Sequence, residues 1–320
     1  MLLDAASLYF RAFYGVPTSV TTPDGRPINA VRGFLDMTAR LIAAHGPDRL
    51  VACWDDDWRP AFRVAALPSY KAHRVAVEGG EEVPDELSPQ VPVLVEVLAA
   101  AGVDRVGAPG FEADDVIGTL ATRARGPVDV VTGDRDLFQL VDDAREVRIL
   151  YTARGISDIE FVDEAAVAAK YGIPGRAYAD FAVLRGDPSD GLPGVAGVGA
   201  KTAAALINEF GDLAGIRAAV ARTVVPKPPL TAAVLKKMLA AADYLDAAPV
   251  VVAVAKAIDL PPVEEASPVP RRPGGAGRAR GTARHRELGQ AAGRGSRLAG
   301  GRAGLRVRAR STCRPRWPRR

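Results

Sequence analysis

The sequence predicts an α/β fold, in which a mostly parallel, twisted sheet flanked by helices is followed by a smaller helical region. Three observations support this prediction. Short β-type runs alternate with helix-patterned segments in the first half of the chain, and such alternation favours a parallel sheet covered by helices. Several of these runs end at acids or turn residues. Beyond about residue 176 the remaining patterns are helical.

The predicted strands are short apolar runs, and three of them end at an aspartate. The four runs span residues 2–4, 50–55, 128–134 and 146–152. Asp4, Asp55 and Asp134 fall at the carboxyl ends of the first three. In open parallel sheets this edge forms the ligand crevice. We therefore expect the three aspartates to share one site.

The predicted helices divide the chain into two regions. They span residues 29–46, 88–102 and 114–126, and then residues 176–186, 201–211 and 230–248. We therefore expect a core over residues 1–175 and a helical region over residues 176–265. A polar, irregular stretch at about residues 68–90 is typical of a functional loop or lid, although a solvated surface loop explains the pattern equally well.

The charge of the chain is unevenly distributed. The 320 residues carry a net charge of +4, but residues 271–320 contain 16 arginines and one acid, whereas residues 1–270 carry 26 basic and 37 acidic residues. Nucleic-acid binding by the acidic part must therefore depend on local patches and metal ions. Residues 268–320 offer little to bury, and we expect them to be a disordered Arg/Gly/Pro-rich tail.

Composition excludes several classes of protein. The chain has no run of 18 apolar residues, so we expect no membrane span. The N-terminal stretch lacks the features of a signal peptide. Cys53 and Cys313 are the two cysteines and cannot form a disulfide framework. These observations favour a reducing cytoplasm.

Acidic residues recur at five places that the predicted fold brings to one edge of the sheet. Beyond Asp4 and the acids of residues 55–57, these acids are Glu112, Asp114, Asp115, Asp134, Asp136, Asp187 and Asp190. Taken singly, each is explained by a turn or a helix cap. Taken together, they would repel one another unless cations lie among them or the carboxyl groups take up protons.

The ligand set favours hard divalent cations. Carboxylate oxygens suit Mg²⁺ or Mn²⁺ when water and phosphate oxygens complete the shell. None of the three histidines lies beside these acids in the sequence, which disfavours zinc. Two such ions activate a water molecule and stabilise both oxygens of an in-line displacement at phosphorus. The acids therefore predict phosphodiester hydrolysis.

A glycine-rich turn at residues 191–211 is the second signal. Backbone N–H groups at the start of the following helix, together with a lysine, suit a phosphate. The pattern is typical of a helix–hairpin–helix, and a glycine-rich connection between packed helices is the alternative. The predicted contacts with nucleic acid are Gly194, Gly197, Gly199, Lys201 and Thr202.

The order of the motifs resembles the 5′→3′ exonuclease (flap endonuclease-like) family. The motifs are LLDAASLYFRAFYG, VACWDDDWRPAFR, LPSYKAHR, PGFEADDVIGTLA, VVTGDRDLFQLV and LRGDPSDGLPGVAGVGAKTAAAL. They cover about residues 1–265 and are similar to the bacterial branch, as a stand-alone relative of the N-terminal domain of DNA polymerase I. The resemblance implies a PIN-like or resolvase-like nuclease core followed by a helix–hairpin–helix region.

The resemblance implies that the acids hold two metal ions, directly or through water. The matching residues are Asp4, Asp55, Glu112, Asp114, Asp115, Asp134, Asp136, Asp187 and Asp190. The spacing to Phe62 leaves Asp56 and Asp57 open as alternatives to Asp55. We prefer Asp55 because it ends the apolar strand.

The resemblance also implies contacts with DNA. Tyr70, Lys71 and Arg74 match the base of a helical arch under which the 5′ end of the substrate passes. Arg11 and Lys71 are the candidates for contacting the scissile phosphate. The hairpin at residues 194–202 matches the family's duplex-binding segment, which often holds a K⁺ ion.

The two ends of the chain depart from the family. Residues 268–320 match no family pattern, and their composition is what a GC-rich gene gives when read out of frame. We expect a frameshifted or misassembled C-terminus, which resequencing would test, and a first strand that lacks an upstream residue or two. A genuine tail would be a non-specific anchor for DNA.

The predicted function is 5′→3′ exonuclease and 5′-flap endonuclease activity on DNA, as in primer removal or repair. The expected partners are DNA with a 5′ end or flap and a separate DNA polymerase. We expect a cytoplasmic monomer. The alternatives are a catalytically idle DNA-junction-binding protein and a PIN-type ribonuclease, and an assay on a labelled 5′-flap duplex with and without Mg²⁺ discriminates among the three.

Overall fold

The computed structural model describes residues 1–222 and 225–261. They belong to one compact unit, Met1–Pro270. The boundary expected near residue 175 falls inside this unit and stays a prediction, and the tail at residues 268–320 lies outside the described residues. No helix in the described ranges is long and apolar enough to cross a bilayer.

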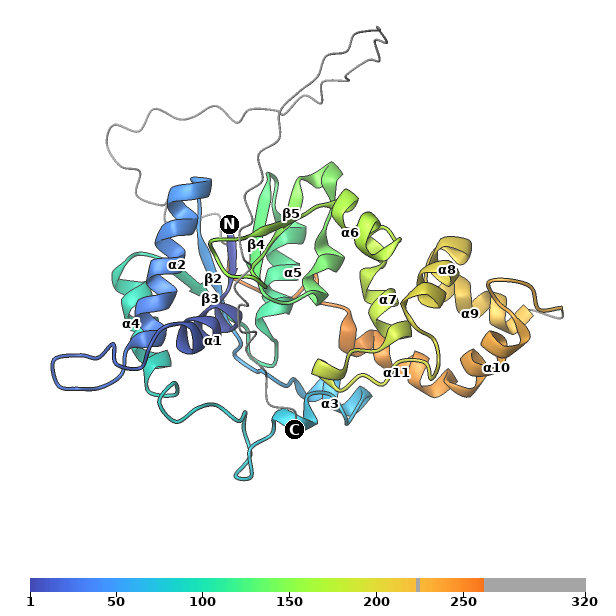
Figure 1. Cartoon of the computed structure of the whole chain (residues 1–320), viewed down its shortest axis with the longest axis horizontal. Helices are drawn as coiled ribbons and strands as arrows, with labels where there is room; N and C mark the ends of the chain where they lie inside the picture. The colour runs from blue at the N-terminus through green and yellow to red at the C-terminus, as the bar shows by residue number, and fades with distance from the viewer. Residues whose placement is uncertain (223–224, 262–320) are drawn as a thin grey trace, which may run out of the picture. The chain divides into compact units, whose positions relative to one another are not determined.

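A six-stranded sheet forms the core of the described part, in the order β3-β2-β1-β4-β5-β6 (Figure 1). The strands are β1 (Leu2–Asp4), β2 (Val51–Cys53), β3 (Asp104–Val106), β4 (Val128–Thr132), β5 (Val147–Tyr151) and β6 (Glu160–Val162). The first five are parallel, and β6 runs antiparallel to β5. The register pairs Asp4 with Cys53, so the residues that follow β1, β2 and β4 meet at one edge.

Helices cover both faces of this sheet. They are α1 (Ala5–Gly15), α2 (Asn29–His45), α3 (Ala61–Ala66), α4 (Gln90–Ala100), α5 (Ala113–Arg123), α6 (Glu164–Tyr171), α7 (Tyr178–Arg185), α8 (Ala200–Phe210), α9 (Leu213–Arg222), α10 (Ala232–Ala240) and α11 (Ala242–Val252). Short 3₁₀ helices are η1 (Ala72–Arg74), η2 (Asp136–Leu140), η3 (Asp143–Arg145), η4 (Gly175–Ala177) and η5 (Pro188–Asp190).

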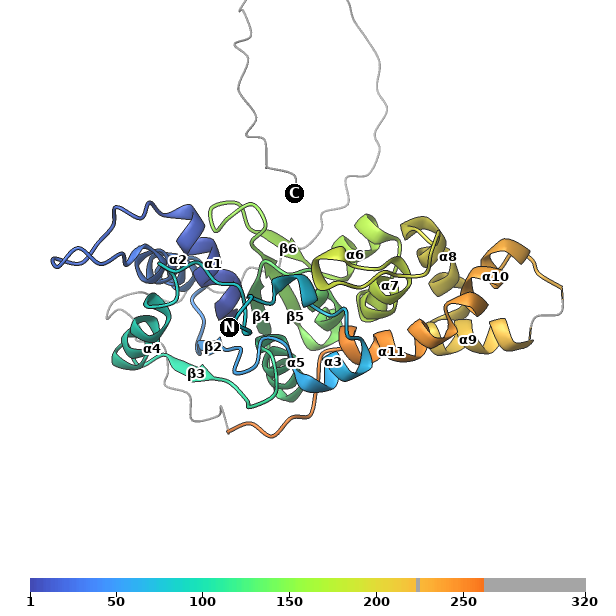
Figure 2. The same ribbon diagram turned by 90° about the horizontal axis from the view of Figure 1, so that it is seen from below.

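Two hydrophobic clusters divide the core because side chains alternate along each strand. Leu2 and Val130 pack with α5, α7 and α11 in one cluster. Leu3 and Val131 pack with α1, α2 and α4 in the other. Helix α3 lies against α11 (Figure 2), so the chain after β2 contacts the last described helix.

The predicted architecture is confirmed, with two local corrections. The sequence did not reveal β3 and β6, which are three residues long, and β3 contains the charged pair Asp104 and Arg105. The single helix expected over residues 230–248 is two helices, because the chain leaves helical geometry at Ala241. The stretch at residues 68–90 is irregular, as expected, with the short helix η1, turns and an isolated bridge between Val75 and Glu81, and its last residue begins α4. Its role as a lid stays a prediction.

Candidate metal centre

Asp4 ends β1 and caps the helix that follows it. Its Oδ1 accepts a hydrogen bond from the Ser7 backbone N–H (3.0 Å), and its Oδ2 accepts one from the Thr132 hydroxyl (2.6 Å). Burial raises the pKa of Asp4 to about 7, and the nearby carboxylates of Asp55 and Asp134 act in the same direction. Asp4 is therefore held in place while it faces other acids.

Asp55, rather than Asp56 or Asp57, faces this edge of the sheet. Its Oδ1 accepts a hydrogen bond from the backbone N–H of Ala113 (2.6 Å), and burial raises its pKa. Asp56 instead pairs with Arg105 at the surface. Asp57 accepts a hydrogen bond from a backbone N–H in its own loop. The structure thus supports the preference for Asp55.

Asp114 lies in the first turn of α5, within electrostatic range of Asp4 and Asp134. Burial raises its pKa well above the ordinary value, and the carboxylates of Asp134 and Asp4 raise it further. The position at a helix start favours a negative charge. Burial beside like charges opposes it. A cation between Asp114, Asp4 and Asp134 would relieve this opposition.

Asp134 and Asp136 lie in a tight turn after β4. The Asp134 N–H donates to the Thr132 hydroxyl (2.8 Å), and the Asp136 N–H donates to Asp134 Oδ1 (2.9 Å). Asp136 is buried, its pKa is raised well above the ordinary value by burial and then by Asp134, and its Oδ1 has no hydrogen-bond partner. A buried oxygen of this kind calls for a cation or a water molecule.

Asp187 caps the short helix η5, and Asp190 is its last residue. Asp187 accepts a hydrogen bond from the Ser189 backbone N–H (3.0 Å) and one from Arg185 (3.3 Å). Asp190 pairs with Arg74 (3.1 Å), and burial raises its pKa to about 6. Both carboxylates therefore already have protein partners at the border of the site.

Five of the acids share one feature, which is that none has an ion-pair partner among the residues the structure describes. We call them the open carboxylates: Asp4, Asp55, Asp114, Asp134 and Asp136. Over the same residues, no group of three or more His, Cys, Asp or Glu side chains is arranged to hold a metal ion. Burial raises the pKa values of Asp4, Asp55, Asp114 and Asp136 in this all-oxygen donor set, and Asp136 Oδ1 is buried without a partner among the described residues. Such a set suits a hard divalent cation.

Glu112 and Asp115, which we call the paired carboxylates, differ from the open carboxylates. The Arg63 guanidinium pairs with Glu112 and also reaches Asp115 through two hydrogen bonds of 2.7 and 2.8 Å. Glu112 also pairs with Lys71 and accepts a hydrogen bond from the Tyr70 hydroxyl (2.7 Å). Two cations thus balance two buried carboxylates.

The expected metal-binding role of Asp115 stays a prediction, and its contacts with protein donors weigh against direct coordination of an ion. Its side chain is fully buried, with 0% exposed. Besides Arg63, it accepts hydrogen bonds from the backbone N–H groups of Ala255 (2.8 Å) and Glu112 (3.2 Å). Both carboxylate oxygens are therefore occupied by protein donors, and Asp115 holds the start of α5 in place.

Arg63 is a buried residue of the site that the sequence analysis did not single out. It lies on α3 and is 2% exposed, although an arginine is almost never fully buried unless it is paired. The available signal was its place at the end of VACWDDDWRPAFR, the motif that carries the strand-end acids. Its partners Glu112 and Asp115 are about 50 residues away in the sequence, so the pairing could not be read from spacing.

The predicted base of the arch is attached to η5. The Lys71 backbone N–H donates to the carbonyl oxygen of Asp190 (3.0 Å), and Arg74 pairs with the Asp190 carboxylate. Burial by itself would lower the pKa of Lys71, but Glu112 raises it well above the ordinary value. Tyr70, Lys71 and Arg74 are thus brought to the site, where Tyr70 and Lys71 contact Glu112.

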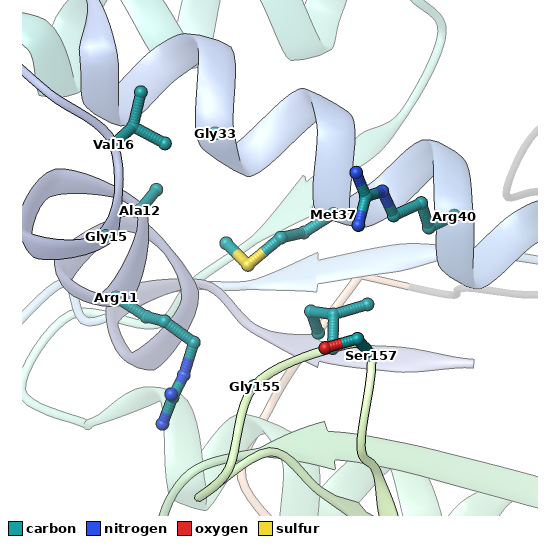
Figure 3. A pocket seen from close by; sticks show the side chains of 10 residues that line it. Arg11, Ala12, Gly15, Val16, Gly33, Met37, Arg40, Gly155 and Ser157 are labelled. Atoms are coloured by element: carbon teal, nitrogen blue, oxygen red, sulfur yellow. The ribbon is translucent and has the colours of Figure 1, made fainter. Parts of the chain in front are cut away.

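Arg11 lies on α1 beside the turn that carries Asp134. A Cβ atom added to Gly133 would come within 3.2 Å of its Nη2, and its Nε is buried without a hydrogen-bond partner. Arg11 also lines a cavity of about 280 Å³ together with Met37, Arg40 and Ser157 (Figure 3). No ion pair of Arg11 is present in the described ranges, so its guanidinium is available to an anion.

The glycine-rich hairpin adopts the expected tight turn. Gly194 and Gly197 have φ values of 69° and 73°, and a Cβ atom at Gly194 would lie 2.5 Å from the backbone of Arg185. The Gly197 carbonyl accepts a hydrogen bond from Lys237 (2.8 Å), a lysine that the sequence analysis did not single out. The remaining predicted residues lie at the start of α8, as its cap and in its first turn: Gly199, Lys201 and Thr202.

Comparison with known families identifies the chain. The family described as "5'-3' exonuclease, N-terminal resolvase-like domain" matches residues 1–172, and the one described as "5'-3' exonuclease, C-terminal SAM fold" matches residues 173–271. The chain belongs to the 5′-3′ exonuclease family. The resemblance inferred from the motifs is thereby confirmed.

Relatives in this family include stand-alone proteins and polymerases. A protein named 5'-3' exonuclease from Streptomyces coelicolor is 61% identical over 273 residues, which are 84% of this chain and 90% of that protein. Its namesake from Mycobacterium tuberculosis is 55% identical over 269 residues, 80% of this chain and 83% of that protein. DNA polymerase I of Mycobacterium bovis is 47% identical over 217 residues, which are 67% of this chain and 23% of the polymerase.

Solved structures share the fold of this 5′-3′ exonuclease family member. The 5′-exonuclease of bacteriophage T5 with bound zinc superposes with a TM-score of 0.60 at 18% identity, and covers 79% of this chain and 88% of that chain. The flap endonuclease of bacteriophage T5 in a complex with DNA and metal ions gives a TM-score of 0.58 at the same identity and coverage. At this identity the likeness concerns the fold.

Proposed function

We propose that this member of the 5′-3′ exonuclease family hydrolyses phosphodiester bonds at the 5′ ends and 5′ flaps of DNA, and that it depends on divalent metal ions. The observation that carries the proposal is the convergence of the five open carboxylates at one edge of the sheet. Asp4, Asp114 and Asp136 have raised pKa values there, and Asp136 Oδ1 is buried without a donor. Without a cation, repulsion among these buried carboxylates would oppose folding into this arrangement.

The open carboxylates would hold the metal ions, which we propose to be two Mg²⁺ or Mn²⁺ ions. Asp187 and Asp190 border the site and could contact the ions through water. When bound, such ions supply an activated water molecule and stabilise the charge that develops on the phosphodiester. The attack of water on phosphorus breaks the bond to the 3′ oxygen and leaves a 5′ phosphate on the product.

Two basic side chains would hold the scissile phosphate in this proposal. Arg11 lies beside the turn of Asp134, and its buried Nε has no hydrogen-bond partner among the described residues. A planar donor of this kind suits a non-bridging phosphate oxygen. Lys71 lies near the acids through its pairing with Glu112, and its raised pKa keeps it charged. Because Tyr70 and Arg63 also contact Glu112, the carboxylate keeps partners when Lys71 turns toward a phosphate.

The helical region would hold the duplex. The exposed start of α8, with Lys201 beside the Gly194–Gly199 turn, offers backbone N–H groups and a positive charge to a phosphate. We extend the proposal to a K⁺ ion at this hairpin and to a boundary near residue 175 between core and helical region. We also propose a monomer that acts in the cytoplasm with a separate DNA polymerase, since relatives carry the same region within DNA polymerase I.

The test is cleavage of a 5′-labelled flap duplex by the full chain with Mg²⁺, with EDTA, and with the double variant Asp134→Asn/Asp136→Asn. We expect Mg²⁺-dependent release of nucleotides or flap oligomers, no cleavage in EDTA, and duplex binding without cleavage by the variant. Full activity in EDTA would contradict the proposal. Binding without cleavage by the wild type would instead indicate an idle junction-binding protein, and preference for an otherwise identical RNA flap would indicate a ribonuclease.

A further inference from the structure

The last two residues of α11 and the segment that follows them pass beside the acids at the start of α5. We call residues 251–260 the C-terminal strap. Its side chains Val254, Ile258 and Leu260 are buried, and a Cβ atom added to Gly118 on α5 would lie 2.7 Å from the carbonyl oxygen of Ala255. The strap therefore packs directly on α5, and no gap separates the two.

Hydrogen bonds fasten this strap to the sheet-based core. Gln139 donates to the carbonyl oxygen of Val252 (3.0 Å) and accepts from the N–H of Val254 (3.1 Å). The Thr119 hydroxyl contacts the carbonyl oxygen of Ala255 (3.2 Å) and the N–H of Ile258 (3.4 Å). These contacts hold the strap but do not involve a carboxylate side chain.

Unlike Gln139 and Thr119, Arg63 joins the strap to carboxylate side chains. Its Nε donates to the carbonyl oxygen of Val251 (2.9 Å), while its two terminal nitrogens donate to Asp115 (2.8 and 2.7 Å) and one of them pairs with Glu112. Asp115 in turn accepts from the N–H of Ala255 in the strap (2.8 Å). The planar guanidinium is thus fixed at all three of its nitrogens.

We propose that Arg63 is a positioning residue for the nuclease reaction, which fixes Glu112 and Asp115 to the C-terminal strap and thereby sets the orientation of Asp114. The inference rests on the proposed function. Asp114 lies between the two paired carboxylates in the sequence and shares the first turn of α5 with Asp115. Any rotation of this turn therefore moves Asp114 relative to Asp4 and Asp134.

The role differs from a direct contact with DNA or metal. Arg63 is 2% exposed, so no phosphate can reach it without unfolding of its surroundings. Its charge and that of Lys71 balance Glu112 and Asp115, which leaves the open carboxylates as the acids that face a cation. A displacement of about 1 Å in a catalytic group can reduce a rate by about 100-fold, so precise holding of Asp114 has a measurable effect.

The main experiment compares Arg63→Lys with Thr119→Val in the full chain, with rates expressed per folded protein. Lysine keeps the positive charge but cannot form the planar fork. We expect Arg63→Lys to lower kcat on a flap duplex by about 100-fold and to raise the Mg²⁺ concentration for half-maximal activity by about 10-fold, with KM for the duplex unchanged. Thr119→Val loosens the same strap and should leave kcat, KM and the Mg²⁺ dependence at wild-type values.

Three results would overturn the inference. An increase in KM at constant kcat would make Arg63 a DNA contact. Wild-type kcat and Mg²⁺ dependence per folded molecule would reduce Arg63 to a structural residue. The same losses in Thr119→Val would assign the effect to the strap as a whole.

A second variant keeps the inference testable if Arg63→Lys does not fold. The double variant Arg63→Gln/Asp115→Asn replaces the buried ion pair with neutral amides and leaves no unpaired charge at Asp115. We expect it to bind the duplex with a similarly reduced kcat, whereas a wild-type kcat, or failure of both variants to fold, would overturn the inference. If the wild type shows no Mg²⁺-dependent cleavage, the proposed function itself fails, and this outcome is distinct from a wild-type rate in the variants.

Discussion

The open and the paired carboxylates lie near one another, yet they differ in their protein partners. Glu112 and Asp115 are surrounded by donors, including the guanidinium of Arg63 and, for Glu112, the ammonium of Lys71. The open carboxylates lack an ion-pair partner among the described residues, and burial raises the pKa values of Asp4 and Asp136. Carboxylates thus stabilise the fold in one group and remain available to a cation in the other.

Asp114 and Asp115 show the contrast most sharply because they are adjacent in the sequence. Successive residues on a helix point about 100° apart. Asp115 therefore faces Arg63 and the strap, whereas Asp114 faces Asp4 and Asp134. The difference teaches that the number of acids in a motif does not give the number of metal ligands, since some acids hold the others in position.

The largest expected effect is that of Asp114→Asn. The variant removes one open carboxylate while keeping the shape of the side chain. We expect cleavage of a flap duplex to fall by more than about 1000-fold, or ~4 kcal/mol of transition-state stabilisation, while the melting temperature of the metal-free protein rises because repulsion by Asp4 and Asp134 is relieved. Activity assays and thermal melts in EDTA measure both. A loss of stability together with retained cleavage would reverse the assignment of Asp114 and Asp115.

The matched variant Asp115→Asn should act in the other direction on stability. It removes the charge that pairs with Arg63 in a fully buried place, so we expect the free energy of unfolding to fall by about 3 kcal/mol or more. Denaturant unfolding with and without Mg²⁺ measures the effect, and Mg²⁺ should not cancel the difference from wild type. Unchanged stability with complete loss of Mg²⁺ binding would show that Asp115 is a metal ligand after all.

Much of the fold was predictable because the sheet is regular. Apolar runs that end at Asp4, Asp55 and Asp134 gave three strands and their shared edge. The strands β3 and β6 were not predictable, because three residues with charged side chains give no periodic signal and are ordered only by their neighbours in the sheet. The break at Ala241 likewise depends on packing of α11 against α3 and α7.

The site was predictable in composition but not in its division of roles. Sequence patterns identified the acids, and the position of Asp55 at a strand end favoured it over Asp56 and Asp57, as the structure supports. The pairing of Asp115 depends on Arg63 and on Ala255, which lies 140 residues away. Contacts at such separations arise from tertiary packing, which no local pattern encodes.

Removal of the metal ions should make the free energy of unfolding depend on pH. This effect should be smaller than the effects of Asp114→Asn and Asp115→Asn. The pKa of Asp4 is about 7 in the folded protein and about 4 in an unfolded chain. Between these values the folded state holds the proton more tightly, so this carboxylate contributes less stability as pH rises from about 4 to about 7. In metal-free melts, Asp4→Asn should therefore be more stable than wild type by an amount that increases from about pH 4 to about pH 7.

Added Mg²⁺ should offset this loss and release protons. At 100 times its dissociation constant, an ion that binds the folded state alone adds ~2.7 kcal/mol of stability. Calorimetric titrations with Mg²⁺ at pH 6.5 or so, in two buffers of different ionisation enthalpy, measure the released protons. An equal Mg²⁺ effect on wild type and Asp4→Asn, with no proton release in either, would remove Asp4 from the open carboxylates.

The smallest expected effect concerns Lys201, a positive side chain that is exposed, unlike Arg63. If it contacts one backbone phosphate of the duplex, Lys201→Ala should weaken binding of every DNA sequence alike and reduce the slope of log K against log salt by about 0.9. Fluorescence anisotropy over a range of salt concentrations measures the slope, with Mg²⁺ replaced by Ca²⁺ to prevent cleavage. Lys170→Ala is the matched control, because Lys170 is also exposed but pairs with Glu160 on the sheet-based core. Equal slopes for the two variants would show that the start of α8 does not hold the duplex, and would leave the acidic edge as the sole supported contact with DNA.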